Sequence, residues 1–144
     1  MQIAVVEGDA RRVPFADNTF DLVLAVTVLC FVSDADLAVR EMARVLVPGG
    51  RLVLADLGKR SLWAAERRAR GWLGSSSWRA ARFRTARETR RLVEKAGLSV
   101  ERARGSIYYP PSGTLARWMA WLDPVLGEIT TEGAAFVCVA GRKP

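Results

Sequence analysis

The hydrophobic positions between residues 20 and 56 predict a strand, a helix and a second strand in succession. Two short apolar runs, Phe20–Val26 and Arg51–Asp56, lack a clean alternation, which is typical of strands covered on both faces in a parallel sheet. Between them, apolar residues recur at about 3.6-residue spacing, as on the buried face of a helix. Ser33 or Asp34 can cap this helix, and a Pro-Gly-Gly sequence at residues 48–50 predicts a turn after it. The stretch therefore predicts one βαβ unit.

The other apolar patterns predict elements that pack on or extend this unit, in an α/β fold. Ile3–Val6 is a short apolar run that predicts a strand, and Gly133–Gly141 predicts a buried final strand. A helix is expected from Ser61 to Leu73, and Thr85–Glu88 is a capping box that begins another. The alternation after Leu98 predicts a strand near the sheet edge, and a short amphipathic helix is expected over residues 114–122.

The composition limits the classes of protein and of chemistry. At 144 residues the chain is one domain of ordinary globular composition. It contains no apolar run near the roughly 18 residues of a membrane span and no signal-peptide pattern at residues 1–13. Cys30 and Cys138 lie in separate apolar segments, which favours buried thiols in the cytoplasm over a disulfide. Because the sequence has no histidine, its residues cannot form a histidine metal site or a Ser-His-Asp triad.

The net charge of +7 comes from one part of the chain. Residues 59–104 hold 14 Lys and Arg against 4 Asp and Glu. A nucleic-acid surface is one interpretation of such a stretch. The alternative is a compositional bias, because 19 of the 22 basic residues are arginine and no nucleic-acid-binding motif accompanies them. We therefore expect no nucleic-acid partner.

The residues of the βαβ unit also carry a family resemblance. The sequence GDARRVPFADNTFDLVLAVTVLCFV, followed by REMARVLVPGGRLVLAD, resembles the second half of a class I S-adenosylmethionine-dependent methyltransferase of the small-molecule type. The resemblance covers residues 5 to about 107. It implies a partial Rossmann-like sheet, mostly parallel with an antiparallel last strand, and S-adenosylmethionine as cofactor.

The resemblance also implies a set of cofactor-binding residues. In this family an acidic side chain after the third strand accepts a hydrogen bond from the adenine amino group, and the next backbone N–H meets a ring nitrogen; Asp9 and Ala10 hold these positions. Small or polar residues after the fourth strand face the methionine part, which points to Ala25, Val26 and Thr27. Asp9 could instead cap a turn, and the Thr27 hydroxyl could bond its own backbone. No catalytic residue and no metal ligand is identified.

Part of the family pattern is absent from the sequence. No G-x-G-x-G turn occurs, and the resemblance begins at the third strand. In the family order 3-2-1-4-5-7-6, strands 1 and 2 lie between Ile3–Val6 and Phe20–Val26, so their absence exposes the edge of the latter. Such an edge invites pairing. The Ile3–Val6 segment could cover this edge, or a partner chain could supply strands that pair with it. Alternatively, the chain could be a fragment of a longer protein, and we favour this last interpretation.

These observations give one leading hypothesis and two alternatives. The chain is expected to be a single truncated domain, with a core at residues 1–58, a helical lid-like region at 59–97 and carboxyl-terminal strands with a short helix at 98–144. Its expected function is methyl transfer from S-adenosylmethionine to a small-molecule acceptor in the cytoplasm, with the chain incomplete for activity. The alternatives are a non-catalytic interaction module, forming a homo-oligomer through the uncovered edge, and a basic nucleic-acid-binding domain.

Overall fold

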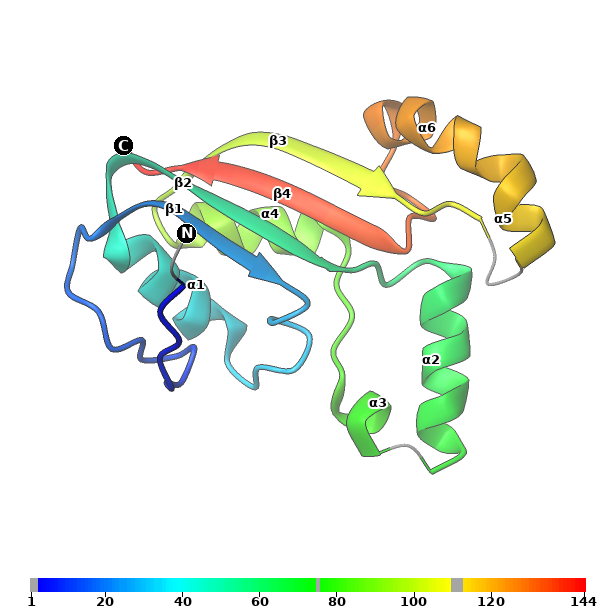
Figure 1. The fold of residues 1–144 in the computed structure, drawn as a ribbon, viewed down its shortest axis with the longest axis horizontal. Coiled ribbons are helices and arrows are strands. Elements are labelled where there is room, and N and C mark those ends of the chain that lie inside the picture. Colours follow the sequence, from blue (N-terminus) through cyan, green and yellow to red (C-terminus); the bar gives the residue numbers. More distant parts are fainter. Residues whose placement is uncertain (1–2, 75, 110–112) are drawn as a thin grey trace.

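The computed structural model describes residues 3–74, 76–109 and 113–144. It is built on a four-stranded sheet in the order β1-β2-β4-β3 (Figure 1). The strands are β1 (Phe20–Val26), β2 (Leu46–Leu57), β3 (Ser99–Ser106) and β4 (Phe136–Arg142). β1 and β2 are parallel, whereas β4 runs antiparallel to both β2 and β3. This arrangement confirms the expected α/β class and the order of the last four strands in the family pattern.

Two helices cover one face of the sheet. α1 (Ala35–Val45) and α4 (Ala86–Lys95) pack against the strands and against each other. Asp34, one of the two expected caps, accepts a hydrogen bond from the Leu37 amide at the start of α1. The predicted capping box begins α4, with Thr85 and Glu88 exchanging hydrogen bonds. α4 can approach β4 closely because residue 141 is glycine: a Cβ there would come within 2.5 Å of the Val93 side chain.

The remaining helices lie beyond the ends of the strands. α2 (Leu62–Trp72) and the short α3 (Ser76–Ala80) follow β2 and project away from the sheet (Figure 1). Between β3 and β4 the chain forms α5 (Gly113–Met119), the 3₁₀ turn η1 (Ala120–Leu122) and α6 (Asp123–Ile129). None of the helices in the described part of the chain is long and apolar enough to cross a lipid bilayer.

The main core lies between the sheet and these two covering helices. Leu52 and Leu54 of β2 are fully buried against Val39 of α1 and Val93 of α4. Each such aliphatic side chain contributes roughly 1.5–3 kcal/mol through burial. A second, smaller cluster of Cys30, Leu57, Ala64 and Phe83 joins α2 and the segment before α4 to the carboxyl ends of β1 and β2; Trp78 packs against it.

An arginine on α1 holds the loop that precedes β1. The Arg44 guanidinium donates to Glu41 at 2.8 Å and to Asp17 at 2.6 Å, and also to the Phe15 carbonyl. These bonds raise the pKa of Arg44 and keep it charged. Glu41 and Arg44 thus form an ion pair with a structural role.

Three expectations about the first strands are wrong. Ile3–Val6 forms no strand and lies exposed, because no neighbouring strand offers it hydrogen bonds. Residues 48–50 do not form a separate turn but lie within β2, where Gly49 has φ +78°. They stay in the ladder because the Gly49 amide donates to the Lys143 carbonyl and the Lys143 amide donates to the Gly50 carbonyl.

The third wrong expectation is that β1 is covered on both faces. Leu22, Leu24 and Val26 point to one face of the sheet and are 57%, 62% and 47% exposed. Val23 and Ala25, on the opposite face, contact the core. β1 is also an edge strand in the described sheet. The chain therefore presents an apolar strand with a free edge and a free face, and the Ile3–Val6 segment does not cover it.

Candidate functional site

The carboxyl ends of β1 and β2 meet at one edge of the sheet. Val26 of β1 is in register with Ala55 of β2, and the Thr27 amide donates to the Ala55 carbonyl at 2.8 Å. The carboxyl edge of parallel strands is where ligands bind in open α/β sheets. The predicted residues after β1 therefore lie at the edge where a ligand is expected.

Thr27 has a backbone conformation that is rare for its residue type. Its φ of +53° lies in the left-handed region, which a β-branched residue seldom adopts and which costs roughly 1–3 kcal/mol. Among the described residues, no hydrogen bond uses its hydroxyl, although its carbonyl accepts one from the Cys30 thiol at 3.7 Å. Strained residues of this kind concentrate at binding sites, so Thr27 is a strong candidate here.

The other two predicted residues of β1 have different surroundings. Ala25 is buried and belongs to the main core. Val26 points to the open face of the sheet. Of the three residues, Val26 and Thr27 are placed where a ligand could touch their side chains, whereas Ala25 shapes the site from within the core.

Asp9 lies in a loop in which Arg11 contacts its carboxylate. The Arg11 backbone amide donates to Oδ1 at 2.8 Å, and Nη2 of the same residue donates to Oδ2 at 2.7 Å. These bonds lower the pKa of Asp9 from 3.8 to about 2, and the side-chain hydrogen bond from Arg11 has the larger effect. Arg11 also donates to the Ser33 hydroxyl at 3.2 Å, which ties the loop to the segment after β1. Ala10 packs against the core.

Both interpretations of Asp9 thus have a structural basis. Its Oδ1 closes a turn at Arg11, as the alternative interpretation predicted, and the Arg12 amide donates to the Asp9 carbonyl at 2.8 Å. Asp9 also carries a permanent negative charge on an exposed carboxylate, which can accept a further hydrogen bond from a ligand. The turn leaves this carboxylate exposed to solvent, where a ligand can reach it.

Sequence reasoning missed a buried carboxylate at the end of β2. Asp56 is 5% exposed; its Oδ1 accepts from the Leu57 amide, and its Oδ2 has no hydrogen-bond partner. A buried polar atom without a partner costs free energy and needs an explanation. The sequence feature that could have identified Asp56 is its position as an acidic residue at the end of the apolar run Arg51–Asp56. This position lies at the same sheet edge as Thr27.

A second polar atom without a partner belongs to the helical region beside this edge. The Arg67 guanidinium lies over the rings of Trp63 and Trp78, 5.4 and 5.3 Å from their centroids, and its Nη1 is buried with no partner. Trp63 itself donates to the Tyr109 carbonyl at 2.9 Å. α2 and α3 therefore carry an aromatic and cationic surface next to the carboxyl ends of the strands.

Cys30 contributes apolar surface and no nucleophile. Burial, followed by the nearby Asp56 carboxylate, raises the pKa of the Cys30 thiol to about 12. A thiol with so high a pKa stays protonated near neutral pH and is inert. No group of three or more Cys, Asp or Glu side chains able to hold a metal ion occurs in the part of the chain that the structure describes.

Replacing Arg11 should release the Asp9 carboxylate. In Arg11→Gln we expect the pKa of Asp9 to rise from about 2 toward 3.8, because the largest stabilising hydrogen bond is lost. The sign follows from linkage: a lowered folded-state pKa stabilises the fold above the unfolded-state pKa, and this contribution is lost as the pH falls toward 2. Carboxyl ¹³C NMR titration measures the pKa. Arg12→Gln is the control, and an unchanged Asp9 pKa in Arg11→Gln would contradict the assignment.

Removing the unpartnered charge of Asp56 should stabilise the fold. Asp56→Asn keeps an oxygen for the Leu57 amide but removes a buried carboxylate charge, so the free energy of unfolding should rise by about 1–3 kcal/mol. Urea denaturation measures this, with exposed Asp21→Asn as the control. A loss of stability in Asp56→Asn would show that Oδ2 makes a favourable interaction in the folded protein.

Comparison with known proteins finds similarity to methyltransferases in part of the chain. Residues 1–54 match the methyltransferase domain family. An uncharacterized protein of Mycobacterium tuberculosis is 35% identical over 116 residues, which are 81% of this chain and 40% of that protein. A ubiquinone/menaquinone biosynthesis C-methyltransferase of Cellvibrio japonicus is 49% identical over 57 residues, 40% of this chain and 23% of that enzyme.

The whole described fold also has counterparts of known structure. A methyltransferase from Thermotoga maritima that depends on S-adenosylmethionine superposes with a TM-score of 0.75 at 26% identity, covering 99% of this chain and 65% of that one. The chain thus spans less than two thirds of the length of each of these proteins. Over residues 1–54 by sequence, and over nearly the whole chain by fold, this protein is similar to S-adenosylmethionine-dependent methyltransferases.

Proposed function

We propose that this chain forms the acceptor-side part of an enzyme that transfers a methyl group from S-adenosylmethionine to a small molecule. The observation that carries the proposal is that strained Thr27 and the buried, unpartnered Oδ2 of Asp56 both lie at the carboxyl edge of β1 and β2. Two departures from ordinary folded geometry at one sheet edge favour a role in binding or chemistry there. The similarity to the methyltransferase domain family over residues 1–54 supplies the reaction class.

The residues present fit part of the cofactor. The exposed, ionised carboxylate of Asp9 is a suitable acceptor for an adenine amino group, and the backbone N–H of Ala10 would donate to an adenine ring nitrogen. Val26 and Thr27 would line the methionine part, with Ala25 supporting them from the core. The glycine-rich turn that approaches the cofactor most closely in this family has no counterpart in the 144 residues. We infer that activity requires a further segment.

The proposed methyl transfer depends little on titratable side chains. S-adenosylmethionine supplies an electrophilic methyl group, which passes to a nucleophilic atom of the acceptor while the sulfur retains the electron pair of the broken bond and the acceptor loses a proton. Such a transfer depends on alignment and on exclusion of water. A chain without histidine and with an inert Cys30 is compatible with it.

We assign the lid role to residues 59–97, and in particular to α2 and α3. Trp63, Arg67 and Trp78 form the surface of these helices nearest to the second hydrophobic cluster. An aromatic surface of this kind favours a hydrophobic or aromatic acceptor. Trp72 is exposed, and the Tyr108 hydroxyl donates to the Thr130 carbonyl. Trp63, which lies beside Arg67, is therefore better placed than Trp72 or Tyr108 to influence acceptor specificity.

Binding of S-adenosylhomocysteine, the demethylated product, tests the proposal. In isothermal titration we expect the protein to bind it and Asp9→Asn to bind about tenfold more weakly, because a hydrogen bond to a charged acceptor contributes roughly 1.5–3 kcal/mol. Asp21→Asn serves as the control for removing an exposed carboxylate. Equal affinities of wild type and Asp9→Asn would remove Asp9 from the site, and absence of binding by the folded protein would show that these 144 residues do not hold the cofactor without the further segment.

A second candidate function, self-association, is favoured by the open side of β1. Leu22, Leu24 and Val26 form a row of exposed apolar side chains on a strand with a free edge, which is a ready template for strand pairing. In this alternative the chain is an interaction module whose sheet continues into a second copy.

Introducing a lysine into β1 tests whether the strand mediates self-association. Leu24→Lys should reduce self-association, since a charge on an edge strand opposes pairing, and should leave stability nearly unchanged because Leu24 is already exposed. Sedimentation velocity over a range of concentrations measures the effect, with Val125→Lys on α6 as the control. A wild-type chain that stays monomeric at all concentrations would contradict this candidate.

A further inference from the structure

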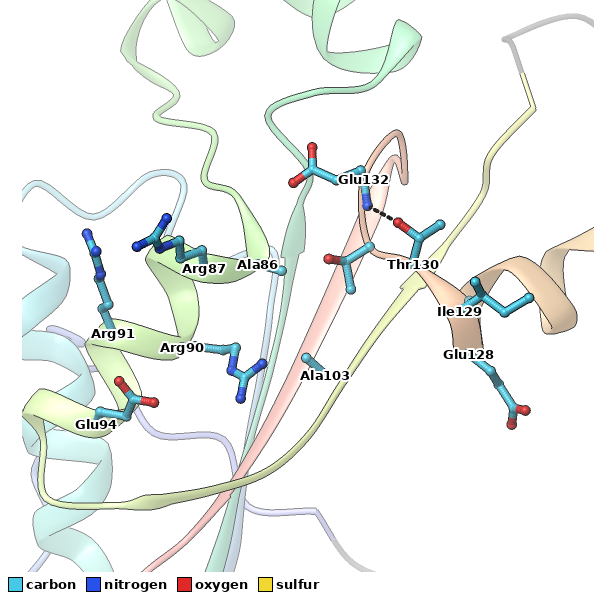
Figure 2. Close-up of a pocket in the computed structure, with 12 residues that line it drawn as sticks. Ala86, Arg87, Arg90, Arg91, Glu94, Ala103, Glu128, Ile129, Thr130 and Glu132 are labelled. Carbon is cyan, nitrogen blue, oxygen red and sulfur yellow. Dashed lines mark hydrogen bonds between the residues drawn. The ribbon is translucent and has the colours of Figure 1, made fainter.

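A hollow in the described surface is lined by residues outside the candidate site. It has a volume of about 530 Å³ and is bounded by α4 on one side and by α6 with residues 130–132 on the other, with Ala103 of β3 between them (Figure 2). Its strand, β3, is at the opposite edge of the sheet from β1, three strand spacings or about 14 Å away. The groove also shares no lining residue with the candidate site.

One wall of the groove is a row of arginines. Arg87, Arg90 and Arg91 line it from neighbouring positions on α4. Figure 2 shows Arg90 extending from α4 toward Ala103, while Arg87 and Arg91 extend from the outer side of the same helix. Across the residues that the structure describes, no hydrogen bond or ion pair engages these three guanidinium groups, although ten other ion pairs are formed.

The carboxylates around the groove do not neutralise this wall. Glu128 is paired with Arg104 at 2.6 Å and Glu132 with Arg60 at 3.0 Å, so both are bound to arginines outside the groove. Glu94, on α4 itself, forms no ion pair within the described chain and is the remaining acidic residue of the lining. The lining thus includes three guanidinium groups and one carboxylate without ion pairs to described residues, which leaves the groove positive.

The opposite wall is held in place by backbone contacts. At the start of α6 the Asp123 carboxylate accepts hydrogen bonds from the Ile107 and Tyr108 amides, which follow β3. α6 reaches β3 closely because residue 127 is glycine: a Cβ at this position would collide with the Gly105 carbonyl oxygen. The groove is therefore a preformed feature of the fold and does not depend on ligand binding to open it.

We propose that this groove binds the phosphate or diphosphate group of a small molecule. Arginine is suited to phosphate because its planar guanidinium can donate two parallel hydrogen bonds. A volume of about 530 Å³ lies within the range of small-molecule sites. Arg90 is the central contact, and Arg87 and Arg91 reach the same anion by rotation of their exposed side chains. The carboxylates of Glu94, Glu128 and Glu132 border the groove, which favours a compact anion over a long nucleic acid passing across it.

The proposal is independent of cofactor binding and methyl transfer, so its test does not require either. Inorganic pyrophosphate is titrated calorimetrically into wild type, into Arg87→Gln/Arg90→Gln/Arg91→Gln, and into a control with the same loss of charge, Arg79→Gln/Arg102→Gln/Arg117→Gln. The control arginines are exposed, lie outside the groove and make no described hydrogen bond or ion pair. Circular dichroism verifies that each variant is folded.

We expect wild type and control to bind pyrophosphate with similar affinity and the groove variant to bind it at least about tenfold more weakly, since charge-assisted hydrogen bonds to the anion are lost. Arg90→Gln alone should account for the largest single share of this loss. Absence of binding by wild type, or an equal loss in both triple variants, would overturn the proposal. A parallel titration with a single-stranded 12-mer oligonucleotide would also overturn it if the oligonucleotide binds more tightly, with the steep salt dependence of a nucleic-acid surface.

Discussion

The pairing of β2 with strands on both sides is the interaction on which the rest of the structure depends. β2 is parallel to β1 and antiparallel to β4, so its backbone groups are bonded along both edges. Its Leu52 and Leu54 are fully buried beneath α1 and α4. Because the direction of β2 sets the edge at which Thr27 and Asp56 meet, and because α2 and α3 follow directly from its end, both the core and the candidate site are arranged by this one strand.

The polar groups without partners are gathered at one end of that strand. Asp56 Oδ2 and Arg67 Nη1 are the buried side-chain atoms left without hydrogen bonds in the described structure. One lies at the carboxyl end of β2 and the other on α2, and the small cluster around Cys30 and Phe83 joins these regions. A fold that satisfies its polar groups elsewhere and leaves these two unpaired is more economically explained by a ligand-binding requirement than by packing.

The arginines of the basic stretch make different kinds of contact in the folded chain, although its composition alone indicates one continuous basic surface. In sequence, residues 59–104 form a single basic block. In the fold, Lys59, Arg60 and Arg104 are paired with glutamates, and Arg67 lies between two tryptophan rings. Of the arginines in this stretch that form no ion pair in the described structure, Arg87, Arg90 and Arg91 lie on one helix beside a hollow of small-molecule size, whereas Arg79 and Arg102 lie elsewhere on the surface. The proposed anion site depends on this local group of arginines and not on the basic stretch as a whole.

The sequence alone indicated the α/β class, the bounds of β1, the Thr85 cap and, as one of two alternatives, the Asp34 cap. These features depend on local periodicity and capping, which neighbouring residues specify. The order of the four strands came from the family resemblance. It could not determine that Ile3–Val6 is not a strand, since a strand requires a partner from elsewhere in the chain. Nor could it reveal the positive φ of Thr27, the unpaired Asp56 or the groove beside Arg90. Each of these arises from contacts between segments distant in sequence, so only the tertiary structure decided them.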